Sequence, residues 1–235
     1  MDAVIQIVRR SNQRGGRMLS VIDLIDAGTL SLRQTAWLLD RILSGASWMV
    51  GAKPGGAGKT TIMSALLTML PQGENICLAN PGNSWRESQS GDCVVAYEIS
   101  PGHYEAYIWG RDVADFASLP GRGARIVTNL HADTLEQARD QIVNDCGTPE
   151  GDFANFDIFL PITMDGGVFR ANRSVEHIHY VKDGQWVTWD KETEPSSKEE
   201  SITEFLEGCR REGIKQVENV RAAWLDFQKD EGYGA

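Results

Sequence analysis

Hydrophobic and polar positions follow two alternating patterns between residues 31 and 189. Short apolar runs of strand length, such as Ser47–Gly51 and Val94–Tyr97, alternate with segments whose apolar residues recur every three or four positions. Strands that alternate with helices are typical of a central sheet layered with helices. The pattern therefore predicts one α/β domain over residues 31–189.

The two ends of the chain have a different pattern. Residues 1–30 form a lead-in segment with glycine breaks, and residues 190–200 are polar and contain Pro195-Ser196-Ser197, which is typical of a linker. The remaining residues, 201–235, return to helical spacing after a capping box that we expect to begin at Ser201. We expect a helical tail packed on the domain, with a partner-binding module as the alternative.

A glycine-rich segment lies between a strand pattern and a helix pattern. The run Ser47–Gly51 precedes Ala52–Thr61, which ends in Gly-Lys-Thr-Thr, and an apolar helix pattern follows over residues 62–70. Strand, glycine loop and helix in this order form a P-loop, in which backbone N–H groups turn toward phosphate oxygens. Lys53 stands where the strict motif has its first glycine. We predict nucleotide binding here, and a plain glycine-rich turn before an ordinary helix is the alternative.

The loop residues indicate ATP and Mg²⁺ as the bound cofactors. Lys59 is expected to reach the β- and γ-phosphates, and the Thr60 hydroxyl is expected to ligate Mg²⁺. The predicted binding residues are Lys53, Gly55, Gly56, Ala57, Gly58, Lys59, Thr60 and Thr61.

A second motif, Thr128-x-x-His131-Ala132-x-Thr134, closes the β-rich run that begins at Arg125. A histidine at the carboxyl end of a strand is where open α/β sheets place groups that contact ligands. Thr134 and Gln137 have the spacing of a helix N-terminus. A lone histidine is more often structural, but this context favours contact with a ligand.

With these two motifs, the chain resembles the secretion ATPases of the type II and type IV superfamily, which includes pilus and archaellum-type motors. The resemblance covers roughly residues 20–183 and also takes in Phe156–Leu160 and Asn172–Ile178. It implies a RecA-like P-loop fold, a central sheet flanked by helices, and a γ-phosphate sensor at His131. It further implies a homo-oligomer, hexameric in relatives, or secretion or pilus machinery as the partner.

The chain departs from this family at its acidic positions. Ala79 and Asn80 stand where the family has an acidic pair before a proline. In Tyr107–Asp112, the closest match to the family's acidic strand, Arg111 replaces the glutamate. The residues before Ser47 are also too few for the family's separate N-terminal domain, so we expect the core without it, and hexamer formation is in doubt.

Two other carboxylates are equal candidates for activating water. Glu98 ends the apolar run Val94–Tyr97, and Asp112 follows the strand at residues 107–109. A carboxylate near the γ-phosphate aligns and polarises the attacking water, which neither arginine nor asparagine can do. The predicted catalytic residues are therefore Glu98, Asp112 and His131, with a solvated or salt-bridged carboxylate as the alternative for each acid.

Composition narrows the classes of function. Lys and Arg number 23 against 33 Asp and Glu, a net charge of −10, which argues against a protein that coats nucleic acid. A local basic cluster does occur near the N-terminus, at Arg9, Arg10, Arg14 and Arg17. No apolar run reaches the length of a membrane span, and we see no signal peptide pattern. Four widely spaced cysteines predict reduced thiols, so we expect a cytoplasmic protein.

Taken together, the sequence predicts an ATP-binding protein that hydrolyses ATP and couples hydrolysis to a conformational change. The alternative is a catalytically degenerate, nucleotide-gated scaffold or regulatory subunit without useful turnover. The intact Gly-Lys-Thr and the histidine motif favour the first, and the displaced carboxylates favour the second. A small-molecule kinase would need an arginine-rich lid, for which we find no pattern.

Overall fold

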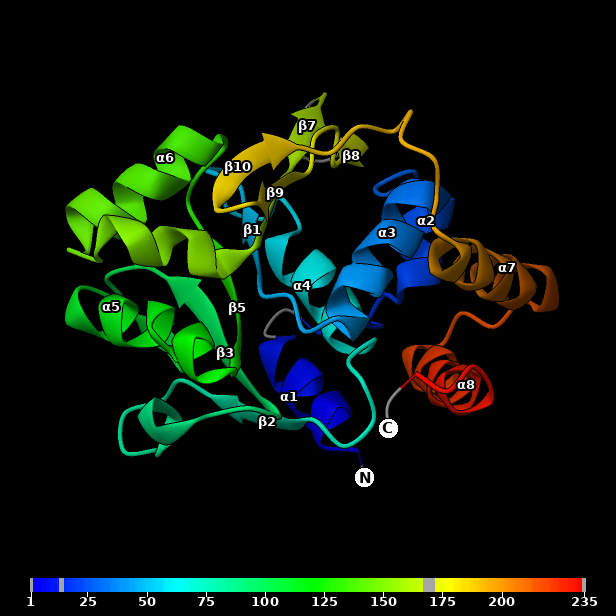
Figure 1. Cartoon of the computed structure of the whole chain (residues 1–235), viewed down its shortest axis with the longest axis horizontal. Coiled ribbons are helices and arrows are strands. Elements are labelled where there is room, and N and C mark those ends of the chain that lie inside the picture. The colour runs from blue at the N-terminus through cyan, green and yellow to red at the C-terminus, as the bar shows by residue number, and fades with distance from the viewer. Residues whose placement is uncertain (1, 13–14, 167–171, 234–235) are drawn as a thin grey trace. The chain divides into compact units, whose positions relative to one another are not determined.

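A computed structural model describes residues 2–12, 15–166 and 172–233 of the chain (Figure 1). The chain forms two compact units. The helical unit comprises Met1–Gly45, Ser64–Gly73 and Asp190–Ala235, and the sheet unit comprises Ala46–Met63 and Glu74–Trp189. The domain boundaries expected from composition stay a prediction, and the contacts place the lead-in and the tail together in the helical unit.

The sheet unit contains the central sheet and a short two-stranded sheet. The eight strands of the central sheet are β1 (Trp48–Gly51), β2 (Asn75–Leu78), β3 (Asp92–Ile99), β4 (Tyr107–Ile108), β5 (Arg125–Leu130), β6 (Ile158–Pro161), β9 (His179–Lys182) and β10 (Gln185–Thr188). The small sheet pairs β7 (Thr163–Asp165) with β8 (Asn172–Ser174).

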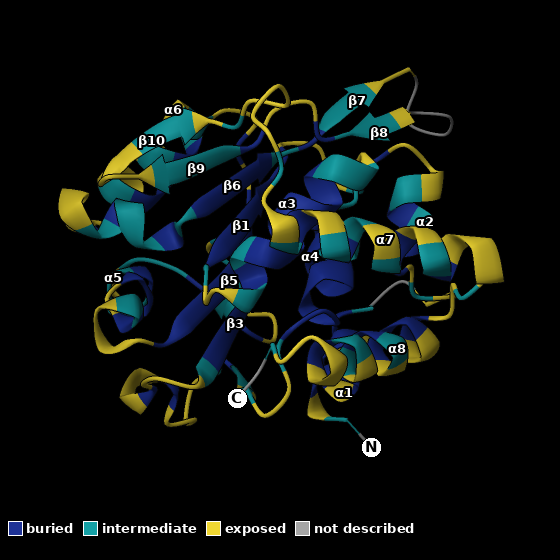
Figure 2. Cartoon of the chain, turned by 45° about the vertical axis from the view of Figure 1, so that its right-hand side comes forward, coloured by how far each residue is buried: buried dark blue, intermediate teal, exposed yellow. Residues whose placement is uncertain are grey.

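The order of the central strands is β10-β9-β6-β1-β5-β3-β2, with β4 paired to β3. Strand β1 lies parallel between β5 and β6, and β5 lies between β1 and β3. Strands β1 and β5 are buried along their whole length, as expected for parallel strands covered on both faces (Figure 2). The predicted α/β fold, with a central sheet and helices, is confirmed.

One face of this sheet packs against α5 (Arg111–Ala117) and α6 (Leu135–Arg139) (Figure 1). The core there joins side chains of β3 and β5 to those of both helices, with Val94, Ile126, Phe116 and Ala138 all fully buried. Short 3₁₀ turns and a π-helical segment connect these elements, namely η1 (Trp85–Glu87), η2 (Leu119–Arg122), η3 (Asp140–Asp145, the π segment) and η4 (Glu150–Phe156).

The helical unit is built from amphipathic helices. They are α1 (Ala3–Ser11), α2 (Val21–Asp26), α3 (Leu32–Leu43), α7 (Ser197–Glu212), α8 (Val217–Asp230) and the second half of α4 (Lys59–Leu67). Helix α7 begins four residues before Ser201, because the Ser196 hydroxyl accepts a hydrogen bond from the Glu199 N–H at 3.1 Å. The expected helix start at Ser201 is therefore wrong, and the interruption at Gly213 is confirmed by its left-handed cap.

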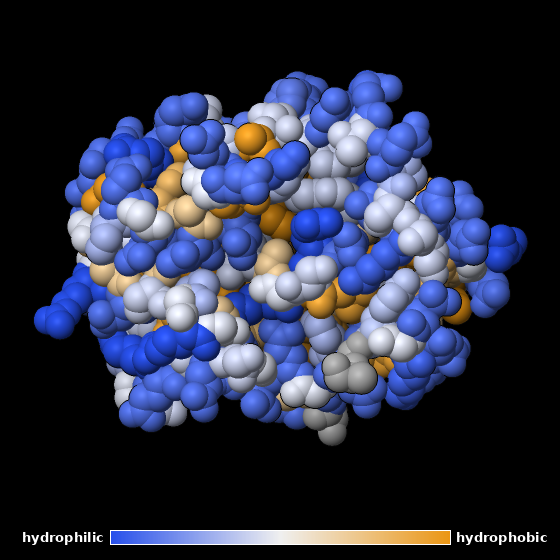
Figure 3. Space-filling view, in the orientation of Figure 1, coloured by the Kyte–Doolittle hydropathy of each residue, from blue (hydrophilic) through white to orange (hydrophobic). Residues whose placement is uncertain are grey.

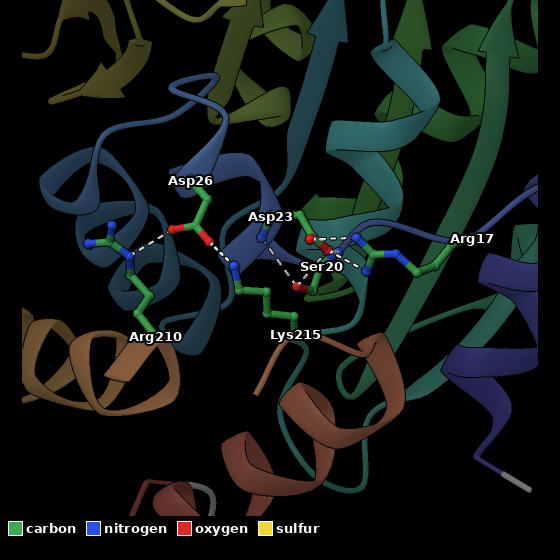
Figure 4. A network of polar contacts seen from close by, with 6 residues as sticks. All are labelled: Arg17, Ser20, Asp23, Asp26, Arg210 and Lys215. Carbon is green, nitrogen blue, oxygen red and sulfur yellow. Dashed lines mark hydrogen bonds and ion pairs between the residues drawn. The ribbon is translucent and has the colours of Figure 1, made fainter. Parts of the chain in front are cut away.

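Two arginines of the N-terminal basic cluster form ion pairs in this unit. Arg9 forms an ion pair with Glu218, and Arg17 binds both carboxylate oxygens of Asp23 (Figure 4). Asp26 pairs with Arg210 and Lys215 in the same view. Arg14 lies outside the described residues.

Hydrophilic residues cover most of the face seen in Figure 3. Among the described residues, the large hydrophobic side chains that are exposed are Leu19 and Tyr104. No helix in the described parts of the chain has the length and apolar character needed to cross a membrane. All four cysteines are free, and burial raises the pKa of the Cys146 thiol to about 11.

Candidate nucleotide-binding site

The glycine loop connects the end of β1 to the start of α4. Gly51, the last residue of β1, has no room for a side chain, because a Cβ there would lie 2.3 Å from the Ala132 carbonyl oxygen. Gly56 and Gly58 have φ values of +84° and +104°, which favour glycine. Helix α4 then begins at Lys59. The strand, loop and helix predicted for a P-loop are therefore present.

Lys59 is buried, with 7% of its surface exposed. Its Nζ donates a hydrogen bond to the Ala52 carbonyl oxygen at 3.1 Å and lies 3.2 Å from Glu98 Oε1. A buried ammonium group needs an opposite charge and acceptors to offset its desolvation. Glu98 provides that charge in this structure.

Glu98 lies near the carboxyl end of β3, where the pairing of β3 with β5 is irregular. The register shifts between Ala96 and Ile99, and the buried Asn129 side chain donates to the Tyr97 carbonyl oxygen at 2.8 Å. Bulges of this kind redirect side chains and often lie beside active sites. The local irregularity of β3 therefore accompanies the placement of Glu98 beside Lys59.

His131 follows the end of β5 and meets the same carboxylate. Its Nε2 lies 3.4 Å from Glu98 Oε1, and 45% of its side chain is exposed. Oxygen Oε1 of Glu98 is buried and has no hydrogen-bond partner of good geometry. The structure thus brings together Lys59, Glu98 and His131, which the sequence had placed in three separate motifs.

Two backbone contacts tie the loop to the histidine motif. The Lys53 N–H donates to Asp133 Oδ1 at 2.8 Å, and the Lys53 carbonyl oxygen lies 3.4 Å from His131 Nδ1. Lys53, which replaces the first glycine of the motif, is therefore anchored through its main chain while its side chain is exposed. Asp133 was not predicted as a site residue, although it lies within the histidine motif.

Arg173, on β8, extends over the glycine loop. Its Nη2 donates to the Gly56 carbonyl oxygen at 3.4 Å, and its Cδ lies 3.4 Å from the position of a Cβ on Gly58. Arg173 was not predicted as a site residue. It lies in the stretch Asn172–Ile178 that the resemblance takes in, but the spacing within that stretch carries no signal that an arginine there reaches the loop.

The structure does not bring Asp112 to this cluster. Asp112 and Asp115 both pair with the exposed Arg86. The segment matched to the family's acidic strand, Tyr107–Asp112, is not a main strand of the sheet: it forms the two-residue β4 and the start of α5. Glu98 lies on β3, the main strand that pairs with β5 on the side away from β1.

The side chain of Asn80 has a structural role in this structure. Its Oδ1 accepts a hydrogen bond from the Ala106 N–H at 2.6 Å, which holds the loop between β3 and β4. Ala106 has a positive φ of 52°, so this bond holds a turn that few residues adopt freely. Asn80 therefore fixes the loop after β3, and the side chain of Ala79 has no polar atom.

Thr60 and Thr61 open α4 next to Lys59, and both are half-buried. Within the described ranges, no group of three or more His, Cys, Asp or Glu side chains could hold a metal ion. A threonine hydroxyl is a hard oxygen ligand of the kind that Mg²⁺ takes together with the oxygens of a substrate phosphate.

Comparison with known proteins gives matches by structure alone. No family model matches the chain, and no curated protein matches it. The VirB11 ATPase from the Brucella suis type IV secretion system, solved in complex with sulphate, is 14% identical with a TM-score of 0.43, over 77% of this chain and 56% of that one. The Legionella pneumophila ATPase DotB is 9% identical with a TM-score of 0.41, over 86% and 63%. The chain thus spans less than two thirds of either protein.

Proposed function

We propose that this chain binds Mg-ATP in the loop at residues 53–61 and hydrolyses it slowly, coupling turnover to a conformational change. The observation that carries the proposal is the buried contact of Lys59 with Glu98, 3.2 Å apart at the carboxyl edge of a parallel sheet. That edge is where ligands bind in α/β folds. The geometry favours Glu98 over Asp112 as the carboxylate at the site.

The loop supports phosphate binding through its backbone and its charge. Gly56 and Gly58 allow the main chain to turn its N–H groups inward, and the start of α4 adds the partial positive charge of a helix N-terminus. Lys59 is the buried cation of the loop, and Arg173 is a second cation above it. Both can bind phosphate oxygens.

Glu98 and His131 supply the polar groups for the reaction. When phosphate oxygens compete for Lys59, the Glu98 carboxylate is released to accept a proton from water. The water oxygen forms a bond to the γ-phosphorus while the bond to the ADP oxygen breaks. His131, 3.4 Å from Glu98, is proposed to contact the γ-phosphate and to report its presence.

Thr60 is the residue that would hold Mg²⁺, through its hydroxyl. When bound, the cation neutralises charge that develops on the β- and γ-phosphate oxygens. The chain itself supplies the other groups: Lys59 and the loop bind phosphate, and Glu98 orients water.

The test is phosphate release and ATP binding measured on four proteins. We expect the wild type to release phosphate, and Lys59→Ala to lose ATP binding. Glu98→Gln should keep ATP binding and lose turnover by about 10²–10⁴-fold, because general base catalysis contributes that much. Asp112→Asn is the matched control, since this exposed acid pairs with Arg86, and it should behave as wild type. ATP affinity that survives Lys59→Ala overturns the loop assignment.

The alternative proposal is a nucleotide-gated scaffold without useful turnover. It is favoured by the pairing of Glu98 with Lys59, which engages that carboxylate, and by Asn80, whose side chain holds a backbone turn where the family has an acid. ATP binding by the wild type with phosphate release equal to that of Lys59→Ala supports this alternative. Turnover that depends on Glu98 excludes it.

A homo-oligomer, or secretion or pilus machinery, stays our proposal for the partner. It rests on the resemblance of the loop and histidine motifs described above. Light scattering on the purified chain, with and without Mg-ATP, tests the first part. A single mass equal to the monomer under both conditions contradicts self-assembly under those conditions.

A further inference from the structure

Gln141 connects two parts of the candidate site that lie far apart in the sequence. Its Nε2 donates to the Ile99 carbonyl oxygen at 2.7 Å, and its Oε1 accepts from the His131 N–H at 3.2 Å. Ile99 directly follows Glu98 on β3. One buried amide, with 9% of the residue exposed, thus joins the strand that carries Glu98 to the residue that faces it.

The chemistry of this position requires an amide. The two partners are a carbonyl oxygen and an N–H group, so the side chain there must both donate and accept. A carboxylate accepts from His131 but repels the Ile99 carbonyl, and an apolar side chain serves neither. A buried backbone group left without a partner is unfavourable, so the amide bridge also holds both segments in place.

The local helix geometry is consistent with this role. The α-helix that begins after Thr134 changes at Asp140 into π-helix, and the Cys146 N–H bonds to the Gln141 carbonyl oxygen, five residues back. A π turn inserts an extra residue, which rotates the following side chains relative to a regular α-helix, and such turns are frequent at functional sites. Gln141 thus lies at the start of an irregular segment of its helix.

We propose that Gln141 is a positioning residue for the ATPase site, which keeps His131 and Glu98 in place relative to each other. This inference rests on the proposed function. Gln141 touches neither Glu98 nor the nucleotide loop in any contact described above. It acts through the main chain at Ile99 and His131. Misplacement of reacting groups by about 1 Å reduces rates by on the order of 10²-fold, so the bridge is expected to affect turnover more than ATP affinity.

A neighbouring glutamine provides the matched control. Gln137 also accepts a backbone N–H with its Oε1, from Asp133 at 3.0 Å, but its described contacts lie within its own loop and do not reach β3. Gln137→Leu therefore removes a similar hydrogen bond without breaking the bridge. We expect hydrogen exchange at the His131 amide to increase in Gln141→Leu and to stay at the wild-type rate in Gln137→Leu.

Turnover and binding then separate positioning from folding. For Gln141→Leu we expect kcat to fall by about 10–100-fold, with ATP affinity close to wild type. Gln141→Glu keeps the acceptor for His131, so its exchange should stay low while its turnover falls. Protonation of that glutamate restores a donor to Ile99, so the ratio of its rate to the wild-type rate should rise as the pH falls. Gln141→Glu therefore tests the positioning role even if Gln141→Leu does not fold.

Each outcome has one meaning. Wild-type turnover in Gln141→Leu, together with fast exchange at His131, overturns the positioning role. A rate ratio for Gln141→Glu that does not change with pH also overturns it. Wild-type protein that neither binds nor hydrolyses ATP defeats the proposed function instead, and the exchange measurement then still shows whether the bridge exists.

Discussion

Individual residues determine how closely the candidate site can be packed. Gly51 ends β1 where the Ala132 carbonyl oxygen and the Phe159 ring approach the position of a Cβ to 2.3 and 2.4 Å. The absence of a side chain there lets the histidine motif lie directly against the phosphate loop. The requirement is steric, because Ala132, which follows β5, and Phe159, on β6, share the space.

We therefore predict that Gly51→Ala lowers the free energy of unfolding by about 3 kcal/mol, the upper end of the cost of overpacking. The cost is high because the nearest atom is a backbone oxygen, which cannot move aside as easily as the end of a flexible side chain. Urea denaturation measures the change. Gly55→Ala is the control, since a Cβ there meets no atom within 4 Å. Equal stability of Gly51→Ala and the wild type would show that the loop can move aside.

A half-buried carboxylate at the amino ends of the central strands predicts a dependence of stability on pH. Burial raises the pKa of Asp157 above its ordinary value of 3.8, while hydrogen bonds from Ser47 oppose the shift. The folded protein then binds more protons than the unfolded chain between 3.8 and the raised pKa. The contribution of this group to stability is therefore lost as the pH rises through that window.

The variant Asp157→Asn removes this titration and keeps an acceptor for the Ser47 N–H. We expect the unfolding free energy of the wild type, relative to that of this variant, to decrease as the pH rises through the window. Denaturation of both proteins at several pH values measures the difference. A difference that is constant with pH contradicts the raised pKa.

At the scale of elements, the phosphate-loop helix α4 has a capped C-terminal end. Arg221 of α8 donates to the carbonyl oxygens of Thr68 and Leu70, at 2.8 and 3.2 Å, and the Trp224 indole N–H donates to Met69 at 2.6 Å. Carbonyl groups at a helix C-terminus lack partners within the helix, and a cation there also complements the helix dipole. The C-terminal tail thus completes α4.

Replacement of this cap is expected to destabilise the protein. Arg221→Met should lower the free energy of unfolding by about 2 kcal/mol, because hydrogen bonds from charged donors contribute about 1.5–3 kcal/mol. Arg210→Met, which removes an exposed pairing with Asp26, should change it by less than about 1 kcal/mol. Thermal unfolding measured by circular dichroism compares the two. Equal effects would show that the Arg221 cap contributes no more than a surface ion pair.

At the scale of the whole molecule, the two compact units are built from distant parts of the chain. The helical unit joins the first 45 residues to the last 46, with the end of α4 between them. The tail provides fully buried apolar side chains to this unit, among them Ile202, Leu206 and Trp224. The tail is therefore part of a core rather than an appended segment.

Truncation after Trp189 is accordingly expected to leave an insoluble or unfolded helical unit. It removes α7 and α8, and with them the partners of α3 and of the α4 cap. Soluble yield and helical content measured by circular dichroism report the loss. Truncation after Asp230 retains both helices and serves as the control. A soluble, folded chain after removal of the tail would contradict its place in the core.

The sequence by itself determined the features that depend on neighbouring residues. The phosphate loop, the strand before it, the helix after it and the position of His131 at a strand end all follow from contiguous patterns, as does Glu98 as one of two candidate acids. Turn chemistry and hydrophobic periodicity act over a few residues, so such patterns predict local structure.

Only the tertiary structure decided which separate segments meet. It placed Glu98, rather than Asp112, 3.2 Å from Lys59, because β3 pairs with β5 and its register shifts beside Glu98. It extended Arg173 over the loop and placed Gln141, at the start of a π segment, against Ile99. Each of these depends on strand order, register or a helix irregularity, which are set by packing between residues far apart in the chain.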